Sequence, residues 1–345
     1  MAASRIVGHK DRNIGLSMHA VLEGSMAIAR YDRRQCRVTG FEEKPEDLGH
    51  HSIVTPVDYV SQKAILNYIA LKRPNIPIIT EEKEDSNPHG LLILKADEPE
   101  LIKKALGKTE GVAVIDPLCG SSPHAAGQVT SKGFIGGSYS VTVGITRFGE
   151  SGLHVIAGAV RDADYKGGTL YYGSAEAGTT AIINGTYVKV GNFIVSFGGR
   201  EINAVVDSRV ANLKESVVIF NADMPLADRY PVLHNALGTI APAARTSLML
   251  ESCGGSMARV SSGWAHGMVH APISPEHWIA GAALIEGAGG KVIFYELDDA
   301  GRPVRLEKLE VRHMLPGVRS AGFVAGNEPI AEELMNMLVN AGRKT

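Results

Sequence analysis

The chain has 345 residues, of which 44% are apolar, so it is long enough for a large core with more than one layer or domain. A net charge of −2 and an aromatic content of 6% argue against a nucleic-acid partner, which calls for a basic face or for base-stacking side chains. Three cysteines are too few for a disulfide framework, and the sequence has neither an apolar signal segment nor a run of membrane-spanning length, so we expect a cytoplasmic protein without a membrane partner.

Two helices are predicted near the start of the chain. Apolar residues at helical spacing indicate one within residues 14–31, and a polar loop or hairpin follows over residues 33–51. The second helix begins behind Thr55, a good N-cap residue that is followed by a proline, and it stops before Pro74.

Two short strands that end in acidic residues come next. The first spans residues 75–82 and ends at Glu81 and Glu82. A helix over residues 98–108 leads to the second strand, which ends at Asp116. Carboxylates at neighbouring strand ends are a common way to build a site for a hard cation.

The stretch VIDPLCGSSPH, residues 114–124, predicts a change from strand to turn to helix. Pro117 cannot donate a ladder hydrogen bond, so the strand should stop at Asp116, and a helix should start behind the Gly-Ser-Ser turn. Such a turn places a carboxylate beside free backbone amides, which suits a metal ion and a phosphate. A thiol, Cys119, is unexpected in the middle of it.

The pattern changes in the second half of the chain. Alternating β-branched and aromatic residues over 137–190 predict an antiparallel meander, in which ING, residues 183–185, makes a hairpin turn. From residue 201, apolar strands alternate with helices. We therefore divide the chain into an N-terminal α+β part, residues 1–195, and a C-terminal α/β part, residues 196–345.

Three motifs occur in order along the chain: TEEKED, VIDPLCGSS and PEHWIAGAALIEGAGGKV. They resemble the signatures of the inositol monophosphatase superfamily, the Mg²⁺-dependent, lithium-sensitive phosphatases. VTPVD, LYYGSAEAGTTAIING and AGFVAGNEPIAEEL extend the resemblance over nearly the whole chain. The resemblance implies a layered α-β-α-β-α sandwich and a homodimer.

The resemblance also implies a site, position by position. Glu81 and Asp116 match carboxylates that bind two or three Mg²⁺ ions in the family, and Leu118 supplies a backbone carbonyl to the same ions. Ser121 matches the threonine that polarises the attacking water together with Glu81. Three residues match the amides that bind the phosphate: Gly120, Ser121 and Ser122.

Two positions depart from the family pattern. Cys119 stands where the family has the second Asp of its Asp-Pro-x-Asp turn. His277 takes the place of the Asp in Trp-Asp, in the register that IAGAALIEGAGG fixes. Both departures fall on metal ligands, and both residues should face one pocket.

Three interpretations of these departures are open. In the first, Glu81, Asp116, Cys119 and His277 form a retuned site that prefers Zn²⁺, Fe²⁺ or Mn²⁺ to Mg²⁺ and binds fewer ions than is usual in the family. In the second, the thiol and the imidazole act on a phosphorylated substrate by elimination, isomerisation or transfer. In the third, the chain binds no metal and is a pseudophosphatase that acts as a binding protein.

We favour the first interpretation. It predicts hydrolysis of a phosphomonoester of a small sugar, polyol or nucleotide, with a divalent cofactor such as Mg²⁺, Mn²⁺ or Zn²⁺. The catalytic residues are then Glu81, Ser121, Cys119 and His277.

Overall fold

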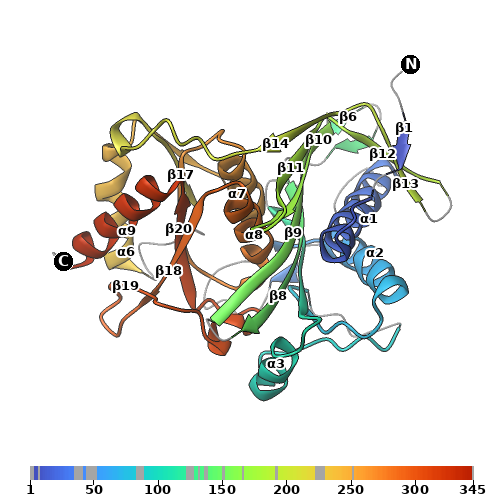
Figure 1. Ribbon diagram of the computed structural model, residues 1–345, viewed down its shortest axis with the longest axis horizontal. Helices are drawn as coiled ribbons and strands as arrows, with labels where there is room; N and C mark the ends of the chain where they lie inside the picture. Colours follow the sequence, from blue (N-terminus) through green and yellow to red (C-terminus); the bar gives the residue numbers. More distant parts are fainter. Residues whose placement is uncertain are drawn as a thin grey trace.

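Two β-sheets alternate with three layers of helices in the computed structural model (Figure 1). The helices are α1 (Arg12–Arg34), α2 (Pro56–Lys72), α3 (Pro99–Leu106), α6 (Pro231–Ile240), α7 (Cys253–Ser261), α8 (Ile279–Gly287) and α9 (Glu328–Gly342). α1 and α2 cover one face of a seven-stranded sheet, α7 and α8 lie between this sheet and a six-stranded sheet, and α6 and α9 cover the far face. The predicted layered sandwich is confirmed.

The structure describes residues 4–6, 8–34, 42–43, 53–82, 89–121, 128–130, 133–135, 139–149, 152–164, 167–190, 193–221, 230–250 and 252–343. Ser122 and most of the predicted loop over 33–51 lie outside these ranges.

The seven-stranded sheet has the order β14-β11-β10-β9-β8-β5-β4. Its strands are β4 (Ile78–Thr80), β5 (Val112–Cys119), β8 (Tyr139–Gly149), β9 (Gly152–Asp164), β10 (Gly167–Ser174), β11 (Gly178–Ile183) and β14 (Arg200–Ala204). β4 and β5 are parallel, and every other neighbouring pair is antiparallel. The ends of β4 and β5 therefore lie side by side, which is what a cation site built from their acidic residues needs.

The six-stranded sheet has the order β16-β15-β17-β20-β18-β19. Its strands are β15 (Val217–Asn221), β16 (Thr246–Met249), β17 (Gly267–Ile273), β18 (Lys291–Leu297), β19 (Pro303–Arg305) and β20 (Ala321–Gly326). The chain passes from the seven-stranded sheet to the six-stranded sheet between residues 204 and 217. A smaller three-stranded sheet joins β1 (Ser4–Ile6), β13 (Phe193–Phe197) and β12 (Thr186–Val190). Two further sheets have two strands each: β2 (Glu42–Glu43) pairs with β3 (Ile53–Val54), and β6 (Gln128–Thr130) pairs with β7 (Gly133–Ile135).

β5 is buried on both faces, which explains its unbroken apolar sequence. Ala113 and Ile115 belong to the core under α1 and α2, whereas Val112 and Val114 belong to the core between the two sheets. This strand carries the acidic turn, so the turn starts from a strand that is buried along its whole length.

The predicted end of β5 is wrong. The strand does not stop at Asp116 but continues through Pro117 to Cys119, which pairs with Ser140 of β8. The register shifts between Asp116 and Cys119, and this irregularity leaves Pro117 where no ladder hydrogen bond is needed. Cys119 is therefore anchored by a neighbouring strand.

The hairpin predicted at ING is also wrong. Asn184 does turn the chain, with a φ of 54°, but β11 and β12 on either side of it belong to different sheets. The two-strand turn lies earlier, where β10 pairs with β11 from Ser174 to Gly178.

α8 lies unusually close to the seven-stranded sheet. A Cβ atom on Gly144 would lie 2.5 Å from Ile279 Cγ2, and one on Gly158 would lie 2.3 Å from the Ala280 oxygen. Only glycine fits at these contacts, so the two glycines fix the depth of α8 and of the short 3₁₀ helix before it, η3 (Pro275–His277).

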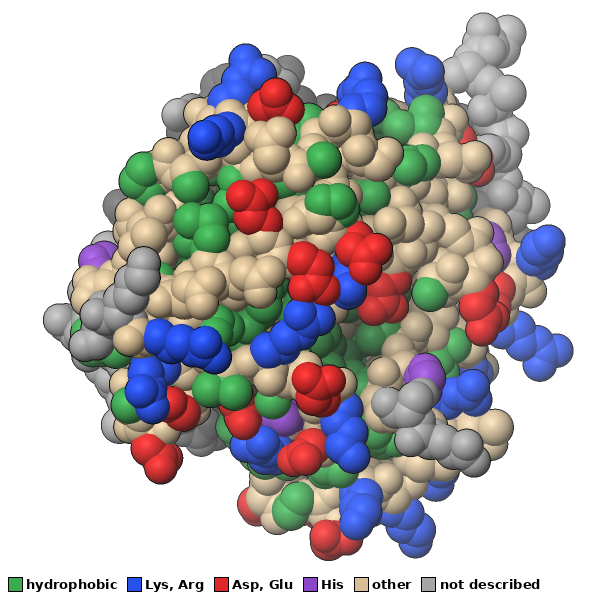
Figure 2. Space-filling view, turned by 60° about the vertical axis from the view of Figure 1, so that its left-hand side comes forward, with side chains coloured by type: hydrophobic (Ala, Val, Ile, Leu, Met, Phe, Trp, Pro, Cys, Tyr) green, Lys and Arg blue, Asp and Glu red, His purple; other side chains and the backbone are tan. Residues whose placement is uncertain are grey.

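The surface carries both signs of charge. Figure 2 shows Lys and Arg side chains interspersed with Asp and Glu side chains over one face, as the net charge of −2 leads us to expect. Among the residues that the structure describes, no helix combines the length and the apolar character that crossing a bilayer requires.

Candidate active site

Three of the predicted ligands meet at the end of β5. Asp116 and Cys119 come from β5, and His277 is the last residue of η3. One donor atom from each lies within 4.8 Å of the others. His277 Nδ1 is 2.7 Å from Asp116 Oδ2, so the residues that depart from the family pattern do share one place in the fold.

Glu81 lies beside this group because β4 runs parallel to β5. The Glu81 amide extends the ladder by donating to the Ile115 oxygen at 3.2 Å. Glu81 Oε1 is 3.9 Å from His277 Nε2, on the side of the ring away from Asp116. The imidazole of His277 is therefore flanked by two carboxylates.

Cys119 is almost completely buried, with 4% of its surface exposed. Its Sγ atom accepts a hydrogen bond of 3.4 Å from the amide of Gly254, in the first turn of α7. A helix N-terminus stabilises negative charge, so this contact favours the thiolate that a metal requires. A Cβ on residue 254 would lie 2.4 Å from Thr142 Cγ2, so the close approach depends on glycine.

The electrostatics of the metal-free group follow from burial and from the two carboxylates. Burial, followed by the charge of Glu81, raises the pKa of Asp116 to about 7. Burial lowers the pKa of His277, but Glu81 and Asp116 outweigh it and the pKa lies well above its ordinary value. Burial and the charge of Asp116 raise the pKa of the Cys119 thiol. Without a metal, these shifts favour a protonated imidazole, a partly protonated Asp116 and a neutral thiol.

Ser121 lies in the turn after β5, next to Gly120, whose φ of 100° favours glycine. Ser121 Oγ lies 2.8 Å from Asp58 Oδ1 and 3.0 Å from the Leu118 oxygen, and its single hydrogen can be donated to either. The Leu118 carbonyl thus lies in the turn, as the resemblance implies.

Asp58 is the site residue that the sequence analysis missed. The motif VTPVD signals it, but that motif also reads as the start of a helix, and the structure shows that it is both. Asp58 Oδ2 accepts hydrogen bonds from the amide and hydroxyl of Thr55 at 2.7 and 2.6 Å, while Oδ1 faces Ser121. Burial and the charge of Glu81 raise the pKa of Asp58, so it belongs to the same acidic group.

The chemistry of the donor atoms decides which metal fits. A thiolate, an imidazole and a carboxylate suit Zn²⁺ and related transition metals, whereas Mg²⁺ requires oxygen ligands. The three donor atoms are close enough to bind one ion. Glu81 offers a further carboxylate, with its Oε1 atom 3.9 Å from His277 Nε2.

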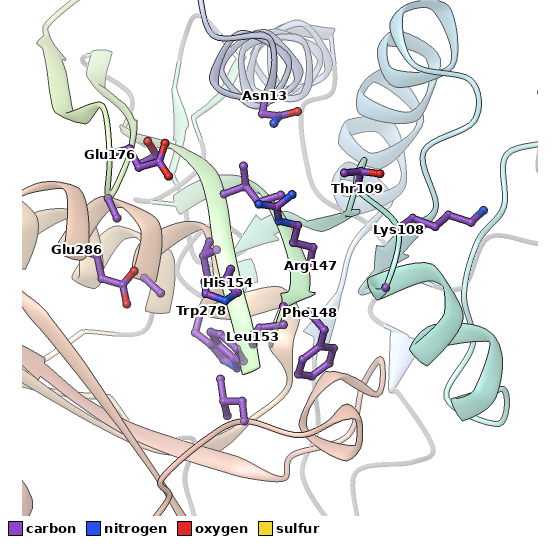
Figure 3. Close-up of a pocket in the computed structure, with 18 of the residues that line it drawn as sticks. Asn13, Lys108, Thr109, Arg147, Phe148, Leu153, His154, Glu176, Trp278 and Glu286 are labelled. Carbon is purple, nitrogen blue, oxygen red and sulfur yellow. The ribbon is translucent and has the colours of Figure 1, made fainter. Parts of the chain in front are cut away.

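A cavity of about 760 Å³ lies over the tip of the β8–β9 hairpin and reaches Trp278, the residue after His277. Figure 3 shows Arg147 and His154 in its middle, with Glu176 and Glu286 on one side and Lys108 on the other. Arg147 neighbours the start of β5, so it lies roughly 20 Å from the acidic turn at the other end of that strand. Among the described residues, none of the predicted site residues lines this cavity.

Comparisons with known proteins agree with the fold and the motifs. The profile of the inositol monophosphatase family matches residues 18–335, and the chain belongs to this family. Its members typically depend on divalent metals, and membership supports phosphomonoesterase activity in general. A search among curated proteins finds no match.

Solved structures share the fold at low sequence identity. The extragenic suppressor protein suhB from Bartonella henselae is 14% identical, with a TM-score of 0.62 over 95% of this chain and 98% of that one. An IMPase from Thermotoga maritima is 18% identical, with a TM-score of 0.59 and 96% of both chains covered. The inositol monophosphatase from Anabaena (Nostoc) is also 18% identical, with a TM-score of 0.58 over 95% of this chain and 94% of that one.

Proposed function

We propose that the chain hydrolyses phosphomonoesters of a small sugar, polyol or nucleotide, using one transition-metal ion where its family uses two or three Mg²⁺ ions. The observation that carries this proposal is the sulfur, nitrogen and oxygen trio of Cys119, His277 and Asp116, with donor atoms within 4.8 Å of one another. The fold brings these positions together whatever residues occupy them, so the support for a retuned site is that both replacements, a thiol and an imidazole, are themselves metal-binding groups.

The protein residues divide the work of the reaction. Asp116, Cys119 and His277 would hold the ion, which supplies Lewis acidity and a water of lowered pKa when bound. The amides of Gly120 and Ser121 would bind the phosphate, as the resemblance implies. Ser121 is oriented by its hydrogen bond to Asp58, which makes the hydroxyl a fixed partner for a polar group in the site.

One observation favours a second candidate, in which Cys119 acts as a nucleophile without metal. Asp116 holds His277 through Nδ1, as the acid of a Cys–His–Asp group would. Against this, the thiol is 4% exposed and its pKa is raised, whereas a reactive cysteine is accessible and has a lowered pKa. We therefore rank metal-dependent hydrolysis first.

Metal analysis and a phosphatase screen test the proposal. The protein purified without chelators should contain about one equivalent of Zn²⁺, Mn²⁺ or Fe²⁺, and chelation should abolish hydrolysis of sugar and nucleotide phosphates. Cys119→Ser should lose both metal and activity. Cys253→Ser is the matched control, because Cys253 is an equally buried thiol outside the donor trio.

Two other results would support the interpretations that we rank lower. Activity that survives chelation but not Cys119→Ser would support thiol chemistry. A wild-type protein that binds phosphorylated ligands without metal or turnover would support a pseudophosphatase. We also propose, from the sequence and the resemblance alone, that the protein is a cytoplasmic homodimer.

A further inference from the structure

One buried face of α2 reaches the ends of both strands that carry the candidate site, β4 and β5. Asp58, Ser61 and Gln62 are spaced so that they share a face of the helix. Asp58 accepts a hydrogen bond from Ser121, and Ser61 Oγ donates to the Pro117 oxygen at 2.7 Å. Pro117 lies in the last part of β5, and Ser121 lies in the turn that follows this strand. Gln62 reaches instead to the end of β4.

The amide of Gln62 holds the chain on both sides of Glu81. Its Nε2 donates to the Glu82 oxygen at 3.0 Å, and its Oε1 accepts from the Glu82 amide at 3.3 Å. Its Oε1 also accepts a hydrogen bond from the Thr80 hydroxyl. Gln62 is fully buried, so these hydrogen bonds do not compete with bulk water.

These contacts matter because β4 is short and lies at the edge of its sheet. The strand ends at Thr80, so the backbone of Glu82, the residue after Glu81, makes no hydrogen bonds of the β4–β5 ladder. The paired donor and acceptor of Gln62 replace the ladder at this point. An amide does this and a carboxylate cannot, because a carboxylate has no hydrogen to give to the Glu82 oxygen.

We propose that Gln62 is a positioning residue that fixes Glu81 beside the Asp116, Cys119 and His277 trio. Its role in catalysis rests on the proposed function, whereas its role in placing Glu81 does not. The side chain acts through the backbone of Glu82 and touches none of the donor atoms. Residues that orient ligands in this way typically change metal affinity or activity by 10- to 100-fold when replaced.

Gln62→Met tests the proposal, because methionine has nearly the same length but forms none of these hydrogen bonds. Gln62→Glu is a second variant that keeps the acceptors and loses the donor. Ser17→Ala is the matched control: Ser17 is a fully buried polar residue of α1 whose hydroxyl has no hydrogen-bond partner among the described residues. All variants are compared at a temperature at which each is fully folded.

Four measurements are made on the full-length protein. Hydrogen exchange of the Glu82 amide reports the acceptor side of the contact, and it should be at least tenfold faster in Gln62→Met, which removes the acceptor that Gln62→Glu keeps. A crystal structure should show Glu81 Oε1 moved from its position 3.9 Å from His277 Nε2. Zn²⁺ affinity, from competition with a chromophoric chelator, and kcat on p-nitrophenyl phosphate should each fall by 10- to 100-fold, whereas Ser17→Ala should change neither.

The outcomes separate the two proposals. If the wild-type protein neither binds Zn²⁺ nor turns over substrate, the proposed function fails, and hydrogen exchange with the crystal structure still tests the placement of Glu81. If Gln62→Met melts at a lower temperature but keeps Glu81 in place, Gln62 contributes only to stability and the proposal is overturned. Unchanged Zn²⁺ affinity and kcat in a wild type that has both would overturn it equally.

Discussion

Metal binding should displace protons, and the number displaced can be worked out from the site. Without metal, the Cys119 thiol is neutral and His277 is protonated, since the pKa of each is raised. Both groups must lose a proton before they can bind an ion. Raising the pH by one unit should therefore strengthen Zn²⁺ binding by up to about 100-fold, or about 2.7 kcal/mol, as long as both groups start protonated.

Calorimetry counts these protons directly. Zn²⁺ is titrated into the metal-free protein between pH 6 and 8, in buffers that differ in their enthalpy of ionisation. We expect about two protons released per ion near pH 8 and nearly three near pH 6, because Asp116, whose pKa is about 7, is largely protonated at the lower pH. His277→Ala should release about one fewer.

A count near zero would refute this reasoning. It would mean either that the thiol and imidazole are already deprotonated in the metal-free protein or that Zn²⁺ binds elsewhere. The same count in His277→Ala as in the wild type would show that His277 is not a ligand. Cys253→Ser again serves as the control, and its proton release should match the wild type.

Three further predictions concern the same region. Cys119→Asp combined with His277→Asp should create an oxygen-only set and a measurable Mg²⁺ affinity by calorimetry, because carboxylates suit Mg²⁺. Any phosphatase activity of the wild type should be insensitive to millimolar Li⁺ at low Mg²⁺, since the resemblance ties Li⁺ inhibition to the two carboxylates that are missing. Gly254→Ala should lower the free energy of unfolding by about 1–3 kcal/mol in urea, because its Cβ would lie 2.4 Å from Thr142 Cγ2.

Each of these has a control or a contradicting result. A folded double-Asp variant that binds no Mg²⁺ would show that more than two ligands have changed. Inhibition by Li⁺ in the wild type would argue for a site of the family type. Gly238→Ala is the control for Gly254→Ala: a Cβ there meets nothing within 4 Å, so it should not destabilise α6.

Local signals in the sequence predict helix starts well and strand ends poorly. The start of α2 was predictable because Thr55, Pro56 and Asp58 make the cap by themselves, without the rest of the fold. The end of β5 was not, because its continuation past Pro117 depends on Ser140, a residue of another strand. A pattern along the chain carries no information on such a partner.

Some residues of the candidate site could likewise be predicted from local sequence, whereas others could not. Glu81 and Asp116 stand at strand ends and could be predicted from the sequence as acidic positions. The meeting of Cys119 with His277 came only from the register of a resemblance, and their distance required the structure. Asp58 was missed because a single motif serves both as a helix cap and as the partner of Ser121, and either role accounts for the residues.

The position of η3 has a consequence for how the protein folds. Asp116 and His277 are 161 positions apart in the sequence, and they meet only because Gly144 and Gly158 let α8 approach the sheet. A partly folded chain therefore has no complete coordination group, and an ion that needs all three donors recognises the finished topology alone. By mass action, such an ion at 100 times its dissociation constant would add about 2.7 kcal/mol to the native state and nothing to its precursors. The ion would then act as a latch that holds the two sheets in their native arrangement, whatever reaction the site performs.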